Sequence, residues 1–329
     1  MPWYRKYRTS LDCGNTFGIG IVSSDGKILS NDRDVYKPVL GSGIIPNEAR
    51  DHHERVKESI LKRALDSSKL NLKDVDIVAY SAGPGLSPCL LVGANYAKEL
   101  AEKLNKKLIP INHCIAHLEI GKFTTKCEDP IFVYLSGGNT QVIAFAENKY
   151  RIFGETQDIS IGNCFDTVAR KMNLPMPGGS EIEKLAKEGS YIELPYVVKG
   201  MDVSFSGIQT AALGLIEKKV SKEDLAYSLQ ETCFAMLVEV AERALAHTGK
   251  KEVLLVGGVA VNKRLQKMMR KMCEERGARF YVVPQEYGGD NGVMIALIGM
   301  LAYRNKWKQN FKENILPKWR TDEVSWFKT

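Results

Sequence analysis

The chain contains no apolar run close to the length of about 20 residues that a membrane-spanning helix needs. The first residues, MPWYRKYRTS, contain no apolar core of the kind found in a secretory signal, so we expect no such signal. The seven cysteines are an odd number and include no CxxC pair, which argues against a disulfide framework and a cysteine-based zinc site. These absences predict a protein of the reducing cytoplasm.

Composition and charge are those of an ordinary globular protein. Hydrophobic residues make up 44% and charged residues 26% of the 329 residues. The net charge is +7, and basic residues gather in stretches such as KRLQKMMRK at 263–271. Such a stretch is either a solvated helix face or a contact surface for a polyanion. The charge is compatible with a polyanionic partner but does not require one.

An internal similarity divides the chain into two halves. NTFGIGIVSSDGKILS begins at Asn15, and NTQVIAFAENKYRIFG begins 124 residues later, at Asn139. Each stretch consists of Asn-Thr, an alternating apolar strand, a short polar turn and a second strand. Strand-and-helix units follow each hairpin, which predicts a duplicated α/β fold with two lobes and a cleft between them. We expect the first lobe to span residues 1–125 and the second to span 126–329.

Hydrophobic periodicity predicts the other elements. In the first half we expect helices at 47–66 and near 90–105, strands at 75–81 and 108–111, and a helix that carries two histidines. In the second half we expect helices near 163–173, 181–188, 205–218, 222–248, 262–276 and 291–304, and strands at 253–256 and 280–283. A capping box, SKED at 221–224, predicts the start of the longest helix, and Gly249 its end.

Two of the five histidines lie in INHCIAHLEIGKF at 111–123. His113 and His117 are four positions apart, so in a helix both imidazoles emerge from one face. A metal site would need further donors, and spacing alone leaves two interpretations open. The pair either holds a metal or merely decorates a helix.

Three glycine-bearing loops each follow an apolar strand, at 132–140, 254–262 and 287–296. Gly-Gly after a buried strand allows the backbone to approach a ligand closely, and amides at helix starts suit phosphate. Three such loops in a duplicated α/β chain favour a nucleotide-sized ligand in the cleft over ordinary turns.

The stretch 162–189 adds two carboxylates, Asp166 and Glu183. Carboxylates at such places can accept hydrogen bonds from ribose hydroxyls. The alternative is that Asp166 forms an i,i+4 ion pair with Arg170 and that Glu183 is solvated.

Several long strings resemble one family, in order from about residue 15 to the end. They include NHCIAHLEIGK, YLSGGNTQVIAF, KGMDVSFSGI, LVGGVAVN, GDNGVMIA and WRTDEV. On these strings the chain is identified as a member of the archaeal and eukaryotic branch of the universal tRNA N6-threonylcarbamoyladenosine synthase family. That family is the catalytic subunit of the KEOPS complex and was formerly called O-sialoglycoprotein endopeptidase.

The resemblance implies a duplicated ASKHA fold, the actin-, sugar-kinase- and RNase H-like architecture, with two lobes around a cleft. It implies transfer of the threonylcarbamoyl group from threonylcarbamoyl-adenylate to the N6 amine of the adenine next to the anticodon in ANN-decoding tRNAs. It implies one divalent metal per subunit, Fe²⁺ or Zn²⁺, held by His113, His117, Tyr134 and Asp290. Residues implied for binding threonylcarbamoyl-adenylate or an ATP-like nucleotide are Tyr134, Leu135, Ser136, Gly137, Gly138, Asp166, Gly179, Glu183 and Asn262.

The resemblance also implies partners. These are tRNA, an enzyme that produces threonylcarbamoyl-AMP, and the other KEOPS subunits: a small protein kinase, a dimerising subunit and an accessory small subunit. No membrane partner is implied.

The chain departs from the family at two places. RTSLDCG at 8–14 stands where relatives carry a strand and loop of the form GIEGTA, so Leu11 replaces the usual glutamate. This predicts a weakened strand and a missing polar group near the reacting centre. In GPGLSPCLLVGANYA at 83–97, Leu91 replaces an arginine of the relatives, which affects substrate or partner contacts.

Two other functions compete with the transferase. A non-catalytic subunit that binds nucleotide and partners would be consistent with the altered first loop. A metalloprotease would need a glutamate beside its first histidine, as in HExxH, and Cys114 stands there. The metalloprotease therefore lacks its general base.

Overall fold

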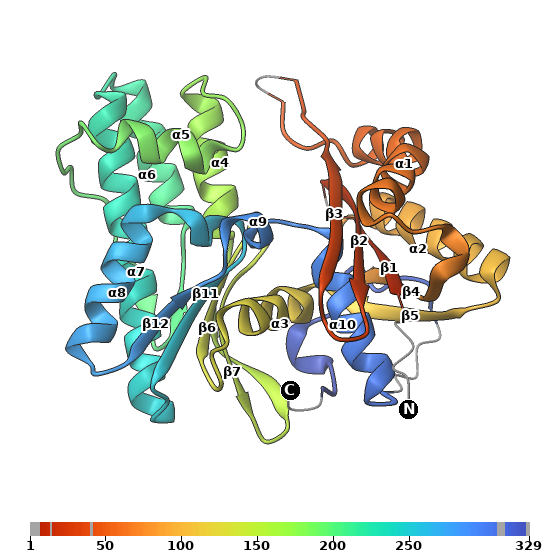
Figure 1. Cartoon of the computed structure of the whole chain (residues 1–329). Coiled ribbons are helices and arrows are strands. Elements are labelled where there is room, and N and C mark those ends of the chain that lie inside the picture. The colour runs from red at the N-terminus through yellow and green to blue at the C-terminus, as the bar shows by residue number, and fades with distance from the viewer. Residues whose placement is uncertain (1–6, 14, 40–41, 308–312, 327–329) are drawn as a thin grey trace. The chain divides into compact units, whose positions relative to one another are not determined.

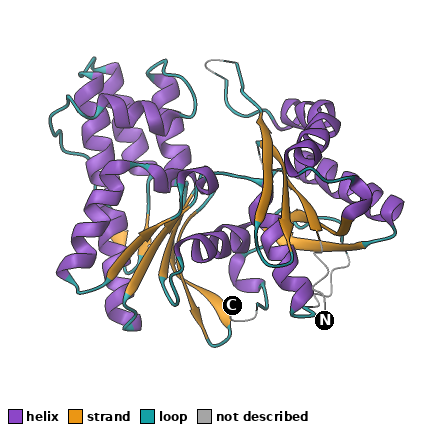
Figure 2. Cartoon of the chain, in the orientation of Figure 1, coloured by secondary structure: helices purple, strands orange, loops and turns teal. Residues whose placement is uncertain are grey.

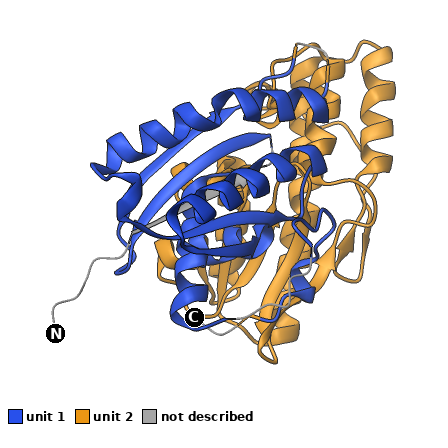
Figure 3. Cartoon of the chain, turned by 90° about the vertical axis from the view of Figure 1, so that its right-hand side faces the viewer, with its two compact units in different colours: residues 1–38, 43–120, 290–325 blue, residues 39–42, 121–289, 326–329 orange. Residues whose placement is uncertain are grey.

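The computed structural model describes residues 7–13, 15–39, 42–307 and 313–326. The chain forms two compact units, coloured blue and orange in Figure 3. The first contains residues 1–38, 43–120 and 290–325, and the second contains residues 39–42, 121–289 and 326–329. This corrects the predicted division at residue 125, because residues 290–325 belong to the first unit.

The first unit is built on a five-stranded sheet (Figure 1). Its order is β3-β2-β1-β4-β5. β1 pairs antiparallel with β2, and β2 with β3, whereas β4 runs parallel to both β1 and β5. The strands are β1 (Tyr7–Cys13), β2 (Thr16–Ser23), β3 (Ile28–Val35), β4 (Val75–Gly83) and β5 (Lys107–Asn112).

The second unit repeats this sheet. Its order is β12-β11-β6-β7-β8, with an antiparallel meander from β6 to β8 and parallel pairing of β11 with both β6 and β12. The strands are β6 (Ile131–Leu135), β7 (Thr140–Ala146), β8 (Lys149–Glu155), β11 (Glu252–Val256) and β12 (Arg279–Val282). β2 and β7 begin at Thr16 and Thr140, which confirms the internal duplication.

Each unit also contains helices (Figure 2). Those of the first unit are α1 (Pro46–Ser68), α2 (Ser87–Leu104), the start of α3 (His113–Thr125) and α10 (Gly292–Arg304). Those of the second are α4 (Ile161–Lys171), α5 (Gly178–Leu185), α6 (Ser206–Glu217), α7 (Lys222–Thr248), α8 (Lys263–Glu275) and the short α9 (Gln285–Gly288), beside a two-stranded ribbon of β9 (Val198–Lys199) and β10 (Asp202–Val203). Short 3-10 turns lie at Leu72–Asp74, Gly258–Val261 and Thr321–Glu323.

Helix α7 shows how local sequence sets an element's limits. Ser221 accepts a hydrogen bond from the amide of Asp224, and Gly249 ends the helix in the left-handed conformation. Both ends confirm the predicted caps. Of the helices in the described part of the chain, none is both long and apolar enough to cross a membrane.

Helix α10 returns the chain to the first sheet. It lies against β1, β2 and β4. At Gly20 and Gly292 the backbones touch so closely that a Cβ on Gly292 would lie 2.2 Å from the Gly20 nitrogen. The two glycines therefore permit a contact that no side chain could, and this contact brings residue 290 back to the first unit.

The altered first loop does form a strand. β1 covers seven residues around Leu11, which pairs with Ile19 on one side and Tyr80 on the other. Backbone hydrogen bonding between two neighbours does not depend on the side chain that is carried, so the strand persists despite the unusual sequence. The predicted weakening is therefore not seen in the pairing, and Gly14 lies outside the described residues.

Candidate metal centre

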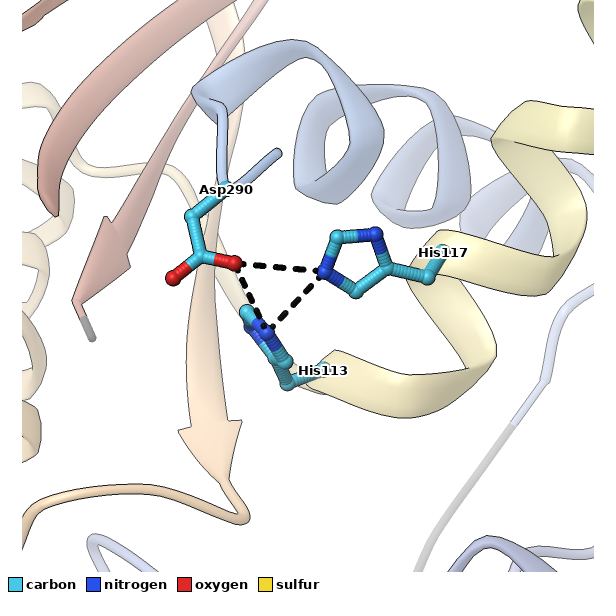
Figure 4. A group of neighbouring side chains, drawn as sticks. All are labelled: His113, His117 and Asp290. Carbon is cyan, nitrogen blue, oxygen red and sulfur yellow. Dashed lines mark hydrogen bonds and ion pairs between the residues drawn. The ribbon is translucent and has the colours of Figure 1, made fainter. Parts of the chain in front are cut away.

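Three side chains from distant parts of the sequence converge in the first unit. His113 and His117 lie on the first turns of α3, and Asp290 lies two residues before α10 (Figure 4). Both imidazoles face the carboxylate, as expected for residues four apart on one helical face. The candidate site thus depends on α10 packing against the first sheet.

The three donor atoms form a nearly equilateral triangle. Nε2 of His117 lies 3.2 Å from Nε2 of His113 and 3.3 Å from Oδ1 of Asp290, and Nε2 of His113 lies 3.4 Å from the same oxygen. Ligands bound tetrahedrally at bond lengths of about 2.0–2.1 Å lie about 3.3 Å from one another. Two imidazoles and a carboxylate suit Zn²⁺ or Fe²⁺ and leave positions for further ligands. The donor set and its spacing fit a metal ion.

The triangle is largely buried. The side chain of His117 is 1% exposed, that of His113 11% and that of Asp290 23%. Burial alone would raise the pKa of the Asp290 carboxyl, but the opposing imidazoles of His113 and His117 lower it well below its ordinary value. Asp290 is therefore held as the carboxylate, the form that binds metal.

Two buried asparagines position the elements that carry the ligands. Oδ1 of Asn112 accepts a hydrogen bond from the Ile115 amide at 3.1 Å and so caps α3 one residue before His113. Oδ1 of Asn291 accepts from the Met294 amide at 3.0 Å and caps α10 one residue after Asp290. Neither asparagine is predicted as a site residue from the sequence, although Asn112 directly precedes the predicted ligand His113 and Asn291 directly follows Asp290.

Further contacts brace the same region. Arg33 on β3 donates to the backbone carbonyl of Asp290 at 3.0 Å. Nδ2 of Asn112 donates to the carbonyl of Trp319 at 3.2 Å, so the C-terminal segment of the unit is tied to the start of α3. These contacts connect the ligand-bearing segments to the first sheet and to the final residues of the unit.

Tyr134, the fourth predicted ligand, lies in the second unit. It is fully buried near the end of β6, and Nδ2 of Asn139 lies 3.5 Å from its hydroxyl oxygen. Its role as a ligand stays a prediction.

The predicted nucleotide-binding residues Tyr134 to Gly138 lie at the carboxyl end of β6. β6 ends at Leu135 and the parallel β11 at Val256, and a Cβ on the next residue, Gly257, would lie 2.2 Å from the Leu135 carbonyl oxygen. Ligands of open α/β sheets bind at such carboxyl ends of parallel strands.

The turn after β6 presents exposed glycines. The Ser136 hydroxyl accepts hydrogen bonds from the amides of Gly138 and Asn139 at 3.3 and 3.0 Å, and the Ser160 hydroxyl donates to the Gly137 carbonyl. Among the described residues, and apart from the adjoining residues of the turn, no heavy atom lies within 4 Å of a Cβ built on Gly137 or Gly138. The hydroxyls of Ser136 and Ser160 therefore hold the turn in place, and its glycines leave space for a ligand.

Asp166 and Glu183 both accept backbone hydrogen bonds in this unit. Oδ1 of Asp166 accepts from the Gly178 amide at 2.8 Å, and Oε1 of Glu183 accepts from the Lys263 amide at 2.7 Å. Burial raises the pKa of Asp166, although the Gly178 amide and Arg170 oppose this shift. Gly179 follows directly after Gly178 on α5.

Asn262 caps α8. Its Oδ1 accepts from the amides of Arg264 and Leu265 at 2.9 and 3.1 Å, and its Nδ2 donates to Gln230 at 3.0 Å. Together with Glu183 it occupies the first three amides of α8, so these amides are already paired. The structure thus groups Asp166, Gly179, Glu183 and Asn262 around α5 and the start of α8, but it gives this helix start no open amides for phosphate.

Sequence comparison identifies the family. The model of the family described as TsaD, tRNA N6-adenosine threonylcarbamoyltransferase, matches residues 26–297. Proteins named tRNA N6-adenosine threonylcarbamoyltransferase from Methanopyrus kandleri and Thermofilum pendens are 53% and 52% identical. The matches cover 88% and 94% of this chain, and 85% and 93% of those proteins.

A longer relative is similar to the same degree. The probable bifunctional tRNA threonylcarbamoyladenosine biosynthesis protein of Methanocaldococcus jannaschii is 52% identical over 94% of this chain. The chain spans 58% of that protein's length.

Solved structures confirm the predicted fold class. HypF from T. kodakarensis superposes with a TM-score of 0.63 at 18% identity, over 92% of this chain and 48% of its own. Component A of the (R)-2-hydroxyglutaryl-CoA dehydratase of Acidaminococcus fermentans has a TM-score of 0.57 at 13% identity, over 91% and 99%. With the repeated sheet order, these similarities show an ASKHA-type α/β fold. The family match and the relatives above decide the membership: the chain belongs to the tRNA N6-adenosine threonylcarbamoyltransferase family.

Proposed function

We propose that this protein transfers the threonylcarbamoyl group from threonylcarbamoyl-adenylate to the N6 amine of the adenine next to the anticodon in ANN-decoding tRNAs. The observation that carries this proposal is the buried triangle of His113, His117 and Asp290 in a chain about half identical to named transferases. We propose that the triangle holds Fe²⁺ or Zn²⁺, with Tyr134 as a further ligand.

The ligand residues have distinct tasks. A bound divalent ion would supply a Lewis acid that draws electron density from a carbonyl oxygen. Asp290 contributes negative charge, and His113 and His117 contribute neutral donors from a rigid helix face. Asn112 and Asn291 keep the two ligand-bearing segments in register. The chain thus presents a preformed set of donors, which reduces the reorganisation needed during reaction.

The second unit would hold the adenylate. The exposed turn at Gly137 and Gly138 would approach the phosphate, while Asp166 and Glu183 would lie near the ribose. In the reaction the amine nitrogen forms a bond to the carbamoyl carbon, the bond from that carbon to the phosphate oxygen breaks, and AMP leaves with a proton released from the amine. Because the mixed anhydride is already activated, positioning and charge neutralisation are sufficient, and no covalent nucleophile is needed.

We propose that the protein works in the cytoplasm with an enzyme that supplies threonylcarbamoyl-AMP. Its further partners would be the KEOPS subunits: the small protein kinase, the dimerising subunit and the accessory small subunit. The support for these partners is family membership.

A reconstituted transfer assay tests the proposal. Labelled threonine, bicarbonate, ATP, an adenylate-forming enzyme, the KEOPS subunits and unmodified tRNA are incubated with the wild-type chain, with His113→Ala and with His247→Ala. His247 is an exposed histidine on α7, so its removal controls for loss of any imidazole. We expect label in tRNA with the wild type and the control, and loss of both label and bound metal in His113→Ala. Absence of label with the wild type, while a related synthase is active under the same conditions, would contradict the proposal.

A non-catalytic subunit is the second candidate, because Leu11 occupies the position of the family's glutamate and Leu91 that of an arginine. Leu91 lies on α2 with 42% of its surface exposed. Restoring a GxEGTA-type loop distinguishes the two candidates: a large gain from near-zero transfer would favour the non-catalytic subunit. The metalloprotease is not supported, because Cys114 is a buried thiol where that mechanism needs a carboxylate.

A further inference from the structure

The outward face of α8 carries a stripe of positive charge. Leu265, Met269, Met272 and Cys273 are buried against the second unit. At 100° per residue, the opposite face of the helix carries Lys263, Lys267, Arg270 and Lys271, which are all exposed. We call these four residues the α8 stripe. It extends about 12 Å along the helix.

The stripe is costly for the helix that carries it. Lys263, Lys267 and Lys271 follow one another at intervals of four residues. They therefore form two i,i+4 pairs of like charge, and such pairs destabilise a helix. The first turn of α8 contains no acidic residue and its last turn no basic one, whereas Glu274 and Glu275 lie at its C-terminal end. This distribution is opposite to the one that the helix dipole favours. A face that served only for solubility would not need this arrangement.

Other basic residues of the helix behave differently. Arg264 forms an ion pair with Glu231 on α7. Arg276, just after α8, forms an ion pair with Glu242, which is also on α7. Within the described part of the chain, neither Lys263 nor Lys267 has a carboxylate partner, and Lys271 has only Glu275 at 3.8 Å. Arg270 lies over the ring of Phe280, with its guanidinium carbon 5.0 Å from the ring centroid. Arg264 and Arg276 thus hold α8 in place, and it is the three lysines of the stripe that remain available to an external anion.

The stripe begins beside the proposed adenylate site. Lys263 is the residue whose amide is bound by Glu183, and it directly follows Asn262. An anionic polymer lying along the first turns of α8 would thus end near the residues assigned to the adenylate. A tRNA backbone has this property, since it presents closely spaced phosphates along its length.

We propose that the α8 stripe is a contact surface for the phosphate backbone of the substrate tRNA. The inference rests on the proposed function and assigns to this helix a part of the substrate that the family motifs do not cover. Contacts of lysine with phosphate do not depend on base sequence, so the stripe would contribute affinity and orientation rather than choice of tRNA.

The test compares two double variants of the full-length chain. The double variant Lys267→Gln with Lys271→Gln removes two positive charges from the stripe, and with them both i,i+4 pairs of like charge. Lys98→Gln with Lys103→Gln removes two lysines from α2 in the first unit, and it is closely matched because Lys98 pairs with Glu102 at 4.0 Å much as Lys271 pairs with Glu275. Binding of an unmodified, ANN-decoding tRNA transcript is measured between about 50 and 200 mM salt, and thermal unfolding is measured in parallel.

We expect the stripe variant to bind tRNA roughly tenfold more weakly and to reduce the slope of log affinity against log salt by about 1.5, the value for two lost phosphate contacts. Its melting temperature should equal or exceed that of the wild type, since helix repulsion is relieved. The α2 variant should bind like the wild type.

Three outcomes would overturn the inference: unchanged affinity and slope in the stripe variant, an equal loss in the α2 variant, or a wild-type chain that does not bind tRNA. Loss of binding to phosphatidylserine vesicles with unchanged tRNA binding would also overturn it, in favour of a membrane surface. Failure here is distinguishable from failure of the proposed function, because the transfer assay with the wild-type chain reports that function separately.

Discussion

The carboxylate of Asp158 fixes the start of α6. Its Oδ1 accepts a hydrogen bond from the Phe205 amide at 2.9 Å, and its Oδ2 accepts from the Ser206 amide at 3.1 Å and from the Ser206 hydroxyl. Phe205 itself offers no side chain for capping. Asp158, 47 positions before Phe205, therefore provides the helix cap that the local sequence lacks. This explains the junction MDVSFSG, for which spacing alone predicts no role.

Asp158 should make the stability of the protein depend on acid pH. Burial would raise the pKa of this carboxyl, but hydrogen bonds from Ser206, Phe205 and Ile159 lower it below the ordinary value of 3.8. A lowered pKa means that the stabilisation is complete at neutral pH and is lost as the pH falls through the folded-state value, below 3.8. Asp158→Asn should therefore melt at a lower temperature than the wild type at pH 7, and the difference should shrink in strong acid.

Melting curves followed by circular dichroism over this pH range check the prediction. Asp66→Asn, at an exposed position of α1, serves as the control. A difference between Asp158→Asn and the wild type that stays constant with pH would show that the carboxylate's charge is not involved.

At the scale of elements, α3 and α10 position the proposed metal ligands. Each begins with a buried asparagine cap, Asn112 or Asn291, adjacent to a ligand. Asn112 does more than cap, since its amide also binds the Trp319 carbonyl of the C-terminal segment. The orientation of His113 therefore depends on both the helix start and the end of the first unit.

Replacement of Asn112 by alanine should weaken both folding and metal binding. The Ile115 amide and the Trp319 carbonyl would lose their partner, and we expect a loss of about 1–2 kcal/mol in the free energy of unfolding. Metal affinity should fall as well, because the first turn of α3 loses its anchor. Ser221→Ala removes a comparable cap from α7 in the second unit and is the matched control. Equal metal affinity in the two variants, measured by titration, would show that Asn112 only stabilises the fold.

The predicted elements agree well with the observed ones. The predicted helix at 222–248 coincides with α7, and the strand predicted at 253–256 lies within β11 (Glu252–Val256). These succeed because caps and hydrophobic periodicity act over a few residues. The capping role of Asp158 and the contact of Asn112 with the Trp319 carbonyl were not predicted, because each joins segments that no local pattern relates.

At the scale of the whole molecule, the main feature that sets the composition of the first unit is that residues 290–325 belong to it. Helix α10 reaches it only because Gly20 and Gly292 meet without side chains. Farther on, the Leu316 amide donates to the Ala82 carbonyl at 2.7 Å, and the Gly85 amide donates to the Pro317 carbonyl at 3.1 Å. These hydrogen bonds connect the end of the first unit to β4 and the turn after it. Packing, rather than order along the chain, therefore assigns residues 290–325 to the first unit.

Gly292→Ala should disturb the fold and the candidate metal centre together. The new Cβ would lie 2.2 Å from the Gly20 nitrogen and 2.4 Å from the Ile19 carbonyl carbon, both backbone atoms that cannot move aside easily. We expect a loss of about 1–3 kcal/mol or more in the free energy of unfolding, as for other overpacked sites.

Gly214→Ala on α6 is the matched control, because no heavy atom of the described residues outside the local helix backbone lies within 4 Å of a Cβ at that position. It should stabilise the protein by about 0.5–1 kcal/mol, since alanine is the better helix former. Chemical denaturation of both variants measures the two effects, and a neutral Gly292→Ala would show that α10 can shift without cost.

The sequence by itself determined the duplicated hairpins, the helices with their caps, the motifs that identify the family, and the pairing of His113 with His117 on one helical face. All of these depend on residues close together in the chain, where spacing fixes direction. The family resemblance implies Asp290 as a ligand, but only the tertiary structure places its carboxylate 3.3 Å from His117, which is 173 positions away in the chain. Its place depends on which faces of α10 and the first sheet fit together, and that complementarity of shape is a property of the packed unit rather than of any short stretch.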